Sequence, residues 1–527
     1  MPDAVVVGAG HNGLVAANLL ADAGWDVVVV EANSAPGGAV RSDESVRPGF
    51  VTDLFSAFYP LGAASPVLDG LDLPAYGVRW VHAPAVVSHV LPDDRAATLY
   101  RELDRTAASL EAFAPGDGAV WRAMYAEFER IREPLLDALF TPFPPVRPAL
   151  RLLRRLGAAD ALRLARFGLT PVRRAGEERF AGAGAPLLLA GNALHTDLPP
   201  EGAGSALYGW LLAMLGQQVG FPVPVGGSGR ITEALLARLL ARGGQLRTGA
   251  RAVRIGIGAD GADAVVLESG ERIAARRAVL ADVAAPALYR DLVGLDRLPA
   301  RLADDVHAFE WDMATLKVNW ALDAPIRWTA EAARDAGTVH LGVDLDGLTH
   351  YAADLATKHI PHQPFVVLGQ MTTADPTRSP AGTESAWAYT HLPARRTEYR
   401  PEEIAEHVER VEAVIERHAP GFGGSVLARS VQAPADLQAA DANLRAGAIN
   451  AGTASLHQQL IFRPVPGLAR SETPIERLYL AGASAHPGGG VHGGPGANAA
   501  RAALGRDGLR GRARAALVNA AHRRIYR

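Results

Sequence analysis

The sequence predicts an α/β fold in which one domain is built on a parallel βαβ unit and a second domain has mixed α+β structure. The chain has 527 residues, more than a single hydrophobic core usually supports, so we expect two domains. Its first forty residues read as strand, glycine-rich turn, helix and second strand. Near the other end, a second glycine-rich stretch joins an apolar strand to a helix-forming segment. A parallel βαβ unit of this kind is typical of the Rossmann-type fold.

Composition is that of an ordinary folded protein and excludes several kinds of function. Hydrophobic residues make up 48% and charged residues 21%, with a formal net charge of -3 at pH 7. We therefore expect no nucleic-acid partner. The chain contains no cysteine, which excludes disulfides, thiolate metal sites and a cysteine nucleophile. His359 and His362 in "HIPH" have no third ligand nearby, so we expect no metal site.

The segment "DAVVVGAGHNGLVAANLLADAGWDVVVVEA" predicts where a dinucleotide binds. Gly8, Gly10 and Gly13 form a G-x-G-x-x-G pattern between the first strand and the helix, whose N-terminus attracts phosphate. Glu31 ends the second strand, where a carboxylate accepts hydrogen bonds from a ribose diol and disfavours NADP. The residues assigned to this contact are Gly8, Ala9, Gly10, Asn12, Gly13, Glu31 and Ala32.

A glycine pair a few residues later indicates FAD rather than NAD. "PGG" places Gly37 and Gly38 where the backbone can approach the pyrophosphate or the ribityl chain closely. With the first fingerprint, it resembles the extended motif of FAD proteins of the glutathione-reductase/amine-oxidase type. Many such proteins have arginine directly after the glycine pair. Here Ala39 takes that place, and Arg41 is the candidate to make the phosphate contact.

The stretch "LYLAGASAHPGGGVHGGPGANAARAAL" has the parts needed to hold a flavin ring. Its glycines let the backbone pass over the ring without side-chain clashes. The helix from about residue 494 would point its positive end at the N1–C2=O edge, which gains negative charge on reduction. The residues assigned here are Gly482, Ala483, Gly490, Val491 and His492.

Five motifs together resemble the bacterial phytoene desaturase-like family of NAD(P)/FAD-dependent oxidoreductases. They are "VVVGAGHNGLVAA", "PVPVGGSGRITEAL", "GGQLRTGARAVRI", "HQQLIFRPVPG" and "LYLAGASAHPGGGVHGGPG". The similar subgroup is the one related to pyridine nucleotide-disulfide oxidoreductase domain-containing proteins. The resemblance implies non-covalent FAD, two interleaved domains, and a backbone contact from Val253 to the adenine. Amine oxidases of the superfamily usually carry an acid where this chain has Ala483, which counts against an amine oxidase.

The interleaved arrangement predicts how the chain is divided. The FAD-binding domain is expected at 1–70, 223–285 and 472–504, and the mixed α+β substrate domain at 71–222 and 286–471. Residues 505–527 form an arginine-rich C-terminal tail.

One basic, amphipathic stretch bears on whether the protein contacts a membrane. Residues 147–168, "RPALRLLRRLGAADALRLARFG", alternate arginine and apolar faces at helical spacing. Such a helix either lies on an anionic membrane or is an ordinary surface helix with arginine stems covering apolar surface. The first apolar strand starts at Ala4 and no long apolar run follows, so we expect a cytoplasmic protein, with peripheral membrane contact as an alternative.

The motifs imply an FAD-dependent oxidoreductase that dehydrogenates carbon–carbon bonds of an apolar, conjugated small molecule by hydride transfer to flavin N5. Three alternatives stay open: an amine or amino-acid oxidase, a flavin-dependent isomerase of a conjugated substrate, and a low-turnover flavoprotein that acts as an interaction partner. The catalytic candidates are His492, His195 and Lys317. His492 flanks the glycine clamp, by which we mean the glycine-rich part of "LYLAGASAHPGGGVHGGPG". Lys317 lies in the strand-like stretch "TLKVNWAL", and in some amine oxidases a lysine holds a water near N5.

Overall fold

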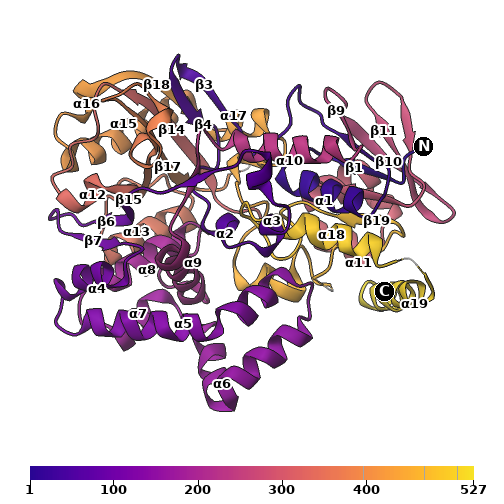
Figure 1. Cartoon of the computed structure of the whole chain (residues 1–527), viewed down its shortest axis with the longest axis horizontal. Coiled ribbons are helices and arrows are strands. Elements are labelled where there is room, and N and C mark those ends of the chain that lie inside the picture. Colours follow the sequence, from indigo (N-terminus) through magenta and orange to yellow (C-terminus); the bar gives the residue numbers. More distant parts are fainter. Residues whose placement is uncertain (396, 468, 507) are drawn as a thin grey trace.

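A five-stranded parallel sheet, in the order β19-β13-β1-β2-β9, lies at the centre of one lobe (Figure 1). The computed structural model describes residues 1–395, 397–467, 469–506 and 508–527. The strands are β1 (Ala4–Val7), β2 (Val27–Val30), β9 (Gln245–Arg247), β13 (Ala278–Ala281) and β19 (Leu478–Leu480). Strands β1 and β2 are runs of small β-branched residues buried along their whole length, as a sheet covered on both faces requires. The predicted α/β class with a Rossmann-type sheet is confirmed.

Helices cover one face of this sheet, and a second small sheet covers the other. The helices α1 (His11–Asp22), α10 (Gly229–Ala241) and α18 (Gly494–Leu504) pack side by side. Gly496 makes the approach of α18 to α1 possible, since a Cβ there would lie 2.0 Å from the main-chain oxygen of Asn12. The small antiparallel sheet consists of β10 (Ala252–Gly258), β11 (Gly261–Leu267) and β12 (Arg272–Ala274).

A seven-stranded mixed sheet forms the other lobe, in the order β18-β14-β17-β16-β15-β6-β7. Its strands are β6 (Ala85–Val90), β7 (Ala96–Leu99), β14 (Ala314–Leu322), β15 (Ala336–Leu341), β16 (Val366–Gln370), β17 (Glu384–Leu392) and β18 (Val426–Gln432). All pairings are antiparallel except that of β15 with β6. The register sets Lys317 of β14 opposite Tyr389 of β17, which brings two polar side chains to one place in the sheet.

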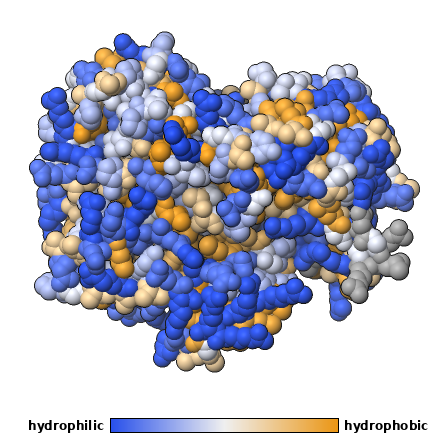
Figure 2. Space-filling model, viewed as in Figure 1, coloured by the Kyte–Doolittle hydropathy of each residue, from blue (hydrophilic) through white to orange (hydrophobic). Residues whose placement is uncertain are grey.

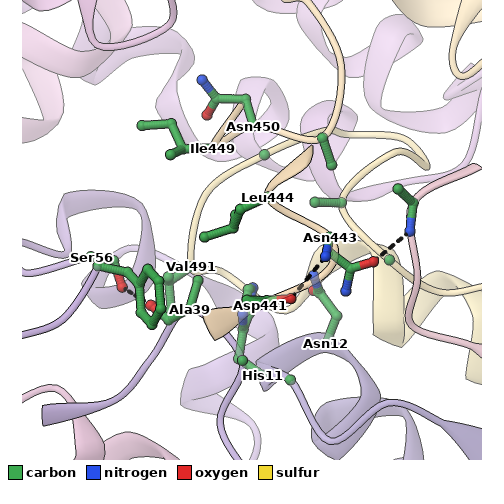
Figure 3. Close-up of a pocket in the computed structure, with 18 of the residues that line it drawn as sticks. His11, Asn12, Ala39, Ser56, Asp441, Asn443, Leu444, Ile449, Asn450 and Val491 are labelled. Atoms are coloured by element: carbon green, nitrogen blue, oxygen red, sulfur yellow. Dashed lines mark hydrogen bonds between the residues drawn. The ribbon is translucent and has the colours of Figure 1, made fainter. Parts of the chain in front are cut away.

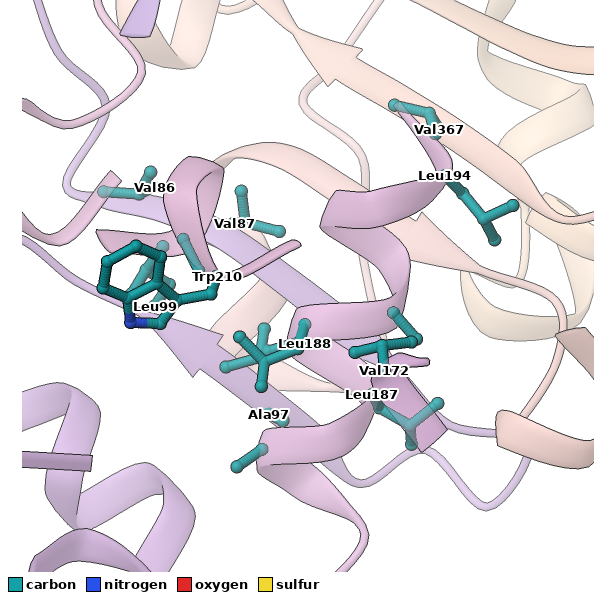
Figure 4. Packing of buried hydrophobic residues seen from close by; sticks show 14 of the residues in the cluster. Val86, Val87, Ala97, Leu99, Val172, Leu187, Leu188, Leu194, Trp210 and Val367 are labelled. Carbon is teal, nitrogen blue, oxygen red and sulfur yellow. The ribbon is translucent and has the colours of Figure 1, made fainter. Parts of the chain in front are cut away.

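The helical layer on one face of this sheet contains the largest core of the molecule. Helices α5 (Asp117–Phe140), α8 (Gly184–Leu194) and α9 (Ser205–Val219) pack on β6, β7 and β16. Figure 4 shows Leu188 of α8 on the side of Trp210 and Leu99, and Leu187 beside Val172. Every residue of α8 is buried, which explains why that helix has no polar face. Helix α15 (Pro401–His418) packs in the core on the sheet's other side.

Helix α6 (Val146–Phe167) projects from the lower edge of the molecule (Figure 1). Gly157 kinks it with a φ of +72°, a conformation that disfavours side chains with a Cβ. Of its residues only Pro148 is buried. In the described part of the chain, no helix is long and apolar enough to cross a membrane.

The remaining elements are shorter or connect the two sheets. The strands are β3 (Ser42–Arg47), β4 (Phe50–Asp53), β5 (Trp80–Val81) and β8 (Val223–Pro224). The helices are α2 (Pro60–Ala63), α3 (Pro66–Asp69), α4 (Leu103–Glu111), α7 (Val172–Arg179), α11 (Ala300–His307), α12 (Glu331–Arg334), α13 (Leu345–Ala356), α14 (Met371–Ala374), α16 (Phe422–Ser425), α17 (Pro434–Ala440) and α19 (Gly508–Ile525). The parallel sheet draws its strands from the ranges 1–70, 223–285 and 472–504, and the seven-stranded sheet draws its strands from 71–222 and 286–471. The division into two domains at those bounds stays a prediction.

Candidate cofactor and substrate site

A cavity of about 790 Å³ extends from the N-terminus of α1 to the seven-stranded sheet. The space-filling view shows the two lobes separated by a hollow along the upper edge of the molecule (Figure 2). Of the residues assigned from the sequence, those lining the cavity are Gly8, Gly10, Asn12, Glu31, Ala32, Gly38, His195, Lys317, Gly482, Ala483, Gly490 and Val491. The two glycine-rich segments, more than 450 residues apart in the chain, therefore border one space.

The turn before α1 is shaped for a group that must come close to the backbone. Gly8 has a φ of +93°, and a Cβ there would lie 2.6 Å from the main-chain oxygen of Asp282. A Cβ at Gly13 would lie 2.2 Å from the oxygen of Gly8, so the helix can meet the strand only without a side chain. The Asn12 Oδ1 atom is buried and has no hydrogen-bond partner among the described residues. That orphaned acceptor, in a cradle free of side chains, fits a polyhydroxylated dinucleotide such as FAD.

Glu31 is held by the backbone at the end of β2. Its Oε2 accepts a hydrogen bond of 2.8 Å from the Ala9 N–H, and its Oε1 accepts one of 2.8 Å from Asn33. These two bonds fix the position of the carboxylate, and Glu31 lines the cavity. The predicted contact of Glu31 with a ribose is compatible with this geometry and stays a prediction.

Arg41 lies outside the cavity lining and binds main-chain carbonyls. Its guanidinium donates to the oxygens of Gly38 and Ala440 at 2.9 Å each. It therefore braces the glycine pair rather than presenting its charge to the cavity, and its phosphate contact stays a prediction. Arg251 does line the cavity, as does Ala252, whereas the neighbouring Val253 does not.

Asp282, which the sequence reasoning missed, caps the N-terminus of α1. Its Oδ2 accepts a hydrogen bond of 2.8 Å from the Gly13 N–H. Burial, with a smaller contribution from the nearby carboxylates Asp441 and Glu31, raises the pKa of this carboxyl to about 8 against the lowering effect of that hydrogen bond. The only sequence signal is an acid directly after the buried strand β13, and nothing local ties it to a glycine 269 residues away.

The segment at 441–450 lines the cavity with residues 441–444, 449 and 450, and Figure 3 shows part of it beside His11 and Asn12 at the start of α1. Asn443 Oδ1 accepts a hydrogen bond of 2.9 Å from the Ala284 N–H, and Asp441 Oδ1 accepts one of 3.0 Å from Asn443. Figure 3 places Asp441 and Asn443 near His11 and Asn12. Sequence reasoning missed this loop because its polar residues have no recognisable spacing.

The glycine clamp before α18 is fixed by histidines. His11 Nε2 lies 3.2 Å from the oxygen of Gly490. His492 is bound through both nitrogens, with Nε2 3.2 Å from the Gly489 oxygen and Nδ1 accepting from Gly494 at 3.1 Å. His492 does not line the cavity, and this geometry favours a role in shaping the clamp; its catalytic role stays a prediction without support from these contacts.

Lys317 lies at the other end of the cavity, in the seven-stranded sheet. Its Nζ donates to the main-chain oxygen of Asp53 and to Asn319 Oδ1, at 2.5 Å each. Burial lowers the pKa of this amine to about 7, while the charge of Asp53 opposes that shift. Nζ also lies 5.7 Å from the ring centre of Trp387, which stacks on Tyr389.

His195, at the end of α8, lines the same part of the cavity. Its Nε2 lies 2.8 Å from the Nε2 of His340, a buried residue of β15 that the sequence reasoning did not single out. Lys317 and His195 are thus brought together in one cavity, and His492 is not.

The fold and the site define a flavoprotein of the type that binds FAD between a Rossmann-type sheet and a second sheet. The family model described as flavin containing amine oxidoreductase matches residues 13–504, and the chain belongs to that family. FAD is its cofactor, which confirms the prediction, and it is an oxidoreductase.

Two curated relatives cover nearly the whole chain. The "Pyridine nucleotide-disulfide oxidoreductase domain-containing protein 2" of Mus musculus is 28% identical over 94% of this chain and 92% of its own. The "Phytoene desaturase (lycopene-forming)" of a Paracoccus species is 25% identical over 93% of this chain and 94% of its own. The resemblance to phytoene desaturase-like oxidoreductases is therefore confirmed. Among solved structures, cyclohexylamine oxidase from Brevibacterium oxydans has a TM-score of 0.59 at 16% identity, covering 95% of this chain and 98% of its own, and shows the fold.

Proposed function

We propose that this protein is an FAD-dependent dehydrogenase that forms carbon–carbon double bonds in an apolar, conjugated small molecule. The observation that carries the proposal is the lining of the cavity beside Lys317. Apolar and aromatic side chains dominate it: Phe58, Leu212, Phe221, Trp387 and Tyr389. Such a wall binds a hydrocarbon chain by removing its surface from water and excludes water from the reacting carbons.

When bound, FAD supplies the acceptor for two electrons, taken from the substrate as hydride. The chain's own residues then position the substrate, keep water out and take up the remaining proton. A proton next to a conjugated carbon system that has lost hydride is strongly acidic, so a weak base such as a buried histidine suffices. The name of the Paracoccus relative, a phytoene desaturase, supports this choice of substrate class. Ala483 supports it too, because it puts no carboxylate at this position of the cavity wall.

Oxidation of an amine is the second candidate function. The family description and the presence of Lys317 in the cavity favour it. The position of that lysine also opposes it, because Nζ already lies over the Trp387 ring, the face that would attract a substrate cation. We therefore rank amine oxidation below dehydrogenation.

Anaerobic stopped-flow absorbance of the purified flavoprotein tests the proposal. The protein is mixed with a panel of polyenes and enones and, in parallel, with a panel of primary and secondary amines. We expect an apolar carbon substrate to bleach the oxidised flavin band. Bleaching by amines alone would overturn the proposal and make Lys317 central to the mechanism.

We also propose that helix α6 touches a lipid surface and that the protein is otherwise cytoplasmic. Three of its leucines are 46–73% exposed: Leu150, Leu153 and Leu162. In Figure 2 hydrophilic and hydrophobic residues lie side by side at the lower projection, where Figure 1 places α6. Most arginines of α6 pair with acidic side chains, among them Arg151 with Asp137. Binding of α6 to lipid would therefore depend more on its exposed leucines than on attraction between its arginines and anionic lipids.

Co-sedimentation with phosphatidylcholine vesicles, with and without phosphatidylglycerol, checks the membrane proposal. We expect Leu162→Asp to reduce the vesicle-bound fraction several-fold. The matched control is Leu427→Asp, a 41% exposed leucine of β18, which should leave binding unchanged. Equal binding of both variants would contradict the proposal.

A further inference from the structure

Three histidines from three different elements lie in a row beneath the aromatic end of the cavity. His195 directly follows the last residue of α8, His340 lies in β15 and His89 lies in β6. His89 and His340 are completely buried, and their ring centres are 5.6 Å apart. Only His195 lines the cavity. Within the described residues, no group of three or more His, Cys, Asp or Glu side chains is placed to hold a metal ion, so metal binding does not explain the row.

The far end of the row fixes the tautomer of His89. Its Nε2 lies 3.2 Å from the main-chain oxygen of Val343. A carbonyl only accepts hydrogen bonds, so the proton of that bond is on Nε2. Burial lowers the pKa of His89 to about 4, against a raising effect from Asp344, and the ring is neutral at pH 7. The Nδ1 atom of His89 therefore carries a lone pair.

The tautomer of His89 determines which ring nitrogen of its neighbour His340 carries the proton. The Nδ1 atoms of His340 and His89 are both buried and have no hydrogen-bond partner among the described residues. Both atoms border the space beside Gly191, because a Cβ there would lie 2.4 Å from Nδ1 of His340 and 3.1 Å from Nδ1 of His89. Two lone pairs that border the same small space repel each other, so we infer that the proton of His340 is on Nδ1. Burial also keeps this ring neutral by lowering its pKa, so its Nε2 has a lone pair.

The last contact determines the state of the ring that meets the cavity. His340 Nε2 and His195 Nε2 are 2.8 Å apart, so one of them donates. Since His340 accepts, His195 donates from Nε2, and its proton-free nitrogen is Nδ1. That atom makes no hydrogen bond to the described residues and is not among the buried unpaired atoms.

We propose that the row His89–His340–His195 holds His195 in the tautomer whose Nδ1 accepts the proton that leaves the substrate. This inference rests on the proposed dehydrogenation. In that step one C–H bond gives hydride, with both electrons, to FAD. The second C–H bond gives its proton to His195 Nδ1, and its electrons form the new double bond. His195 is then the catalytic residue, and His340 and His89 are positioning residues.

Among the described residues, Asp344 lies near His89, and further charged and titratable groups surround His195. His391 and Asp197 form a pair at 2.7 Å near His195, and the charge of His391 lowers the His195 pKa. Tyr351 donates to or accepts from Thr390 beside them, Tyr389 packs edge-on to His195, and Lys317 lines the same cavity. Burial, the largest effect, lowers the pKa of His195 to about 4. We therefore expect flavin reduction to rise between about pH 3 and 5 and to stay constant above.

The first test needs no substrate. The holoprotein is labelled with 15N at histidine, and long-range 15N–1H spectra report which nitrogen of each ring carries the proton. Single substitutions of His89, His195 and His340 assign the signals. We expect protons on Nε2 of His195 and His89 and on Nδ1 of His340. A proton on Nδ1 of His195 would overturn the inference, whatever the substrate is.

The second test separates positioning from mere packing. Anaerobic flavin reduction is measured with whichever polyene or enone of the panel reacts fastest. His340→Phe removes the acceptor for His195 and should slow reduction roughly 100-fold. His340→Gln restores an amide oxygen as acceptor and should recover the rate to within about tenfold. His407→Phe is the matched control, because His407 on α15 is fully buried and unpaired within the described residues but does not line the cavity.

The outcomes distinguish the two proposals. Wild-type rates in both His340 variants, with an unchanged pH profile, would overturn the histidine row and leave the dehydrogenase intact. If no polyene or enone reduces the wild-type flavin, the proposed function is wrong. The 15N spectra then still show whether His195, His340 and His89 have the inferred tautomers. If His407→Phe loses as much activity as His340→Phe, the effect is one of packing, and the inference is wrong.

Discussion

Single residues at this site act through contacts with distant parts of the chain. Asp282 illustrates this, because its carboxyl takes the Gly13 N–H that otherwise points at a ligand of α1. The Oδ2 atom would also lie 2.7 Å from a Cβ at Gly10. A carboxylate in this place opposes the binding of a phosphate, and a protonated carboxyl does not. The raised pKa of Asp282 therefore favours the state that accepts FAD.

The titration of Asp282 predicts a pH-dependent stability. Its pKa is raised by burial from 3.8 to about 8, so the folded protein holds a proton that the unfolded chain has lost between those values. The free energy of unfolding should thus fall as pH rises from about 4 to 8, by at most about 1.4 kcal/mol per pH unit from this group. Asp282→Asn keeps the acceptor for Gly13 and should remove that part of the slope. Chemical denaturation at several pH values measures it.

The control for this prediction is an exposed acid far from the cavity. Asp260→Asn, in the turn between β10 and β11, makes the same change of charge in water. It should leave the wild-type slope in place. A slope unchanged in Asp282→Asn would show that the carboxyl is ionised in the folded protein at neutral pH.

At the scale of elements, the site depends on how closely helices approach each other. Helix α18 reaches α1 only because Gly496 has no side chain, and the clamp that precedes α18 borders the cavity. Gly496→Ala places a Cβ 2.0 Å from the Asn12 oxygen, and backbone cannot yield as a flexible side chain does. We expect a loss of about 1–3 kcal/mol in stability and at least a several-fold lower FAD content.

The ratio of flavin to protein absorbance after purification, together with thermal unfolding, measures both effects. Gly424→Ala is the matched control, because nothing lies within 4 Å of a Cβ there and its backbone suits any residue. Full FAD content in Gly496→Ala would mean that α18 moves without disturbing the clamp.

The glycine-rich turns that border the cavity were predictable from the sequence because their constraint is local. Gly8 and Gly13 shape a turn between neighbouring elements, and Gly490 has a φ of +113°, so the pattern of glycines itself carries the information. Asp282, His340 and the loop at 441–450 could not be predicted in the same way. Each acts through a partner more than a hundred residues away, and an isolated acid or histidine has no pattern. His492 shows the limit of sequence proximity, since it lies next to the clamp in the chain but does not line the cavity; its catalytic role stays a prediction.

For the whole molecule, the cavity is the place where the two lobes meet. Its lining includes Glu31 and Arg251 around the Rossmann-type sheet and Lys317 and Trp387 from the seven-stranded sheet. A ligand that spans the cavity contacts both lobes at once, whereas one that fills only the end near α1 contacts one. Binding stabilises the folded part that holds the ligand, by about 2.7 kcal/mol at a hundredfold excess over Kd.

FAD should therefore couple the unfolding of the two lobes. We expect protein stripped of flavin to unfold in two thermal steps and the FAD-bound protein in one, with the lower step raised by roughly 5–10 °C. Circular dichroism and flavin fluorescence, recorded together, measure this. ADP is the matched ligand, because it carries the adenine, ribose and pyrophosphate without the flavin, and it should raise only the step of the Rossmann-type lobe. If ADP also merges the two unfolding steps, the flavin part of FAD does not stabilise the seven-stranded sheet. The apolar end of the cavity would then be open to substrate independently of the cofactor.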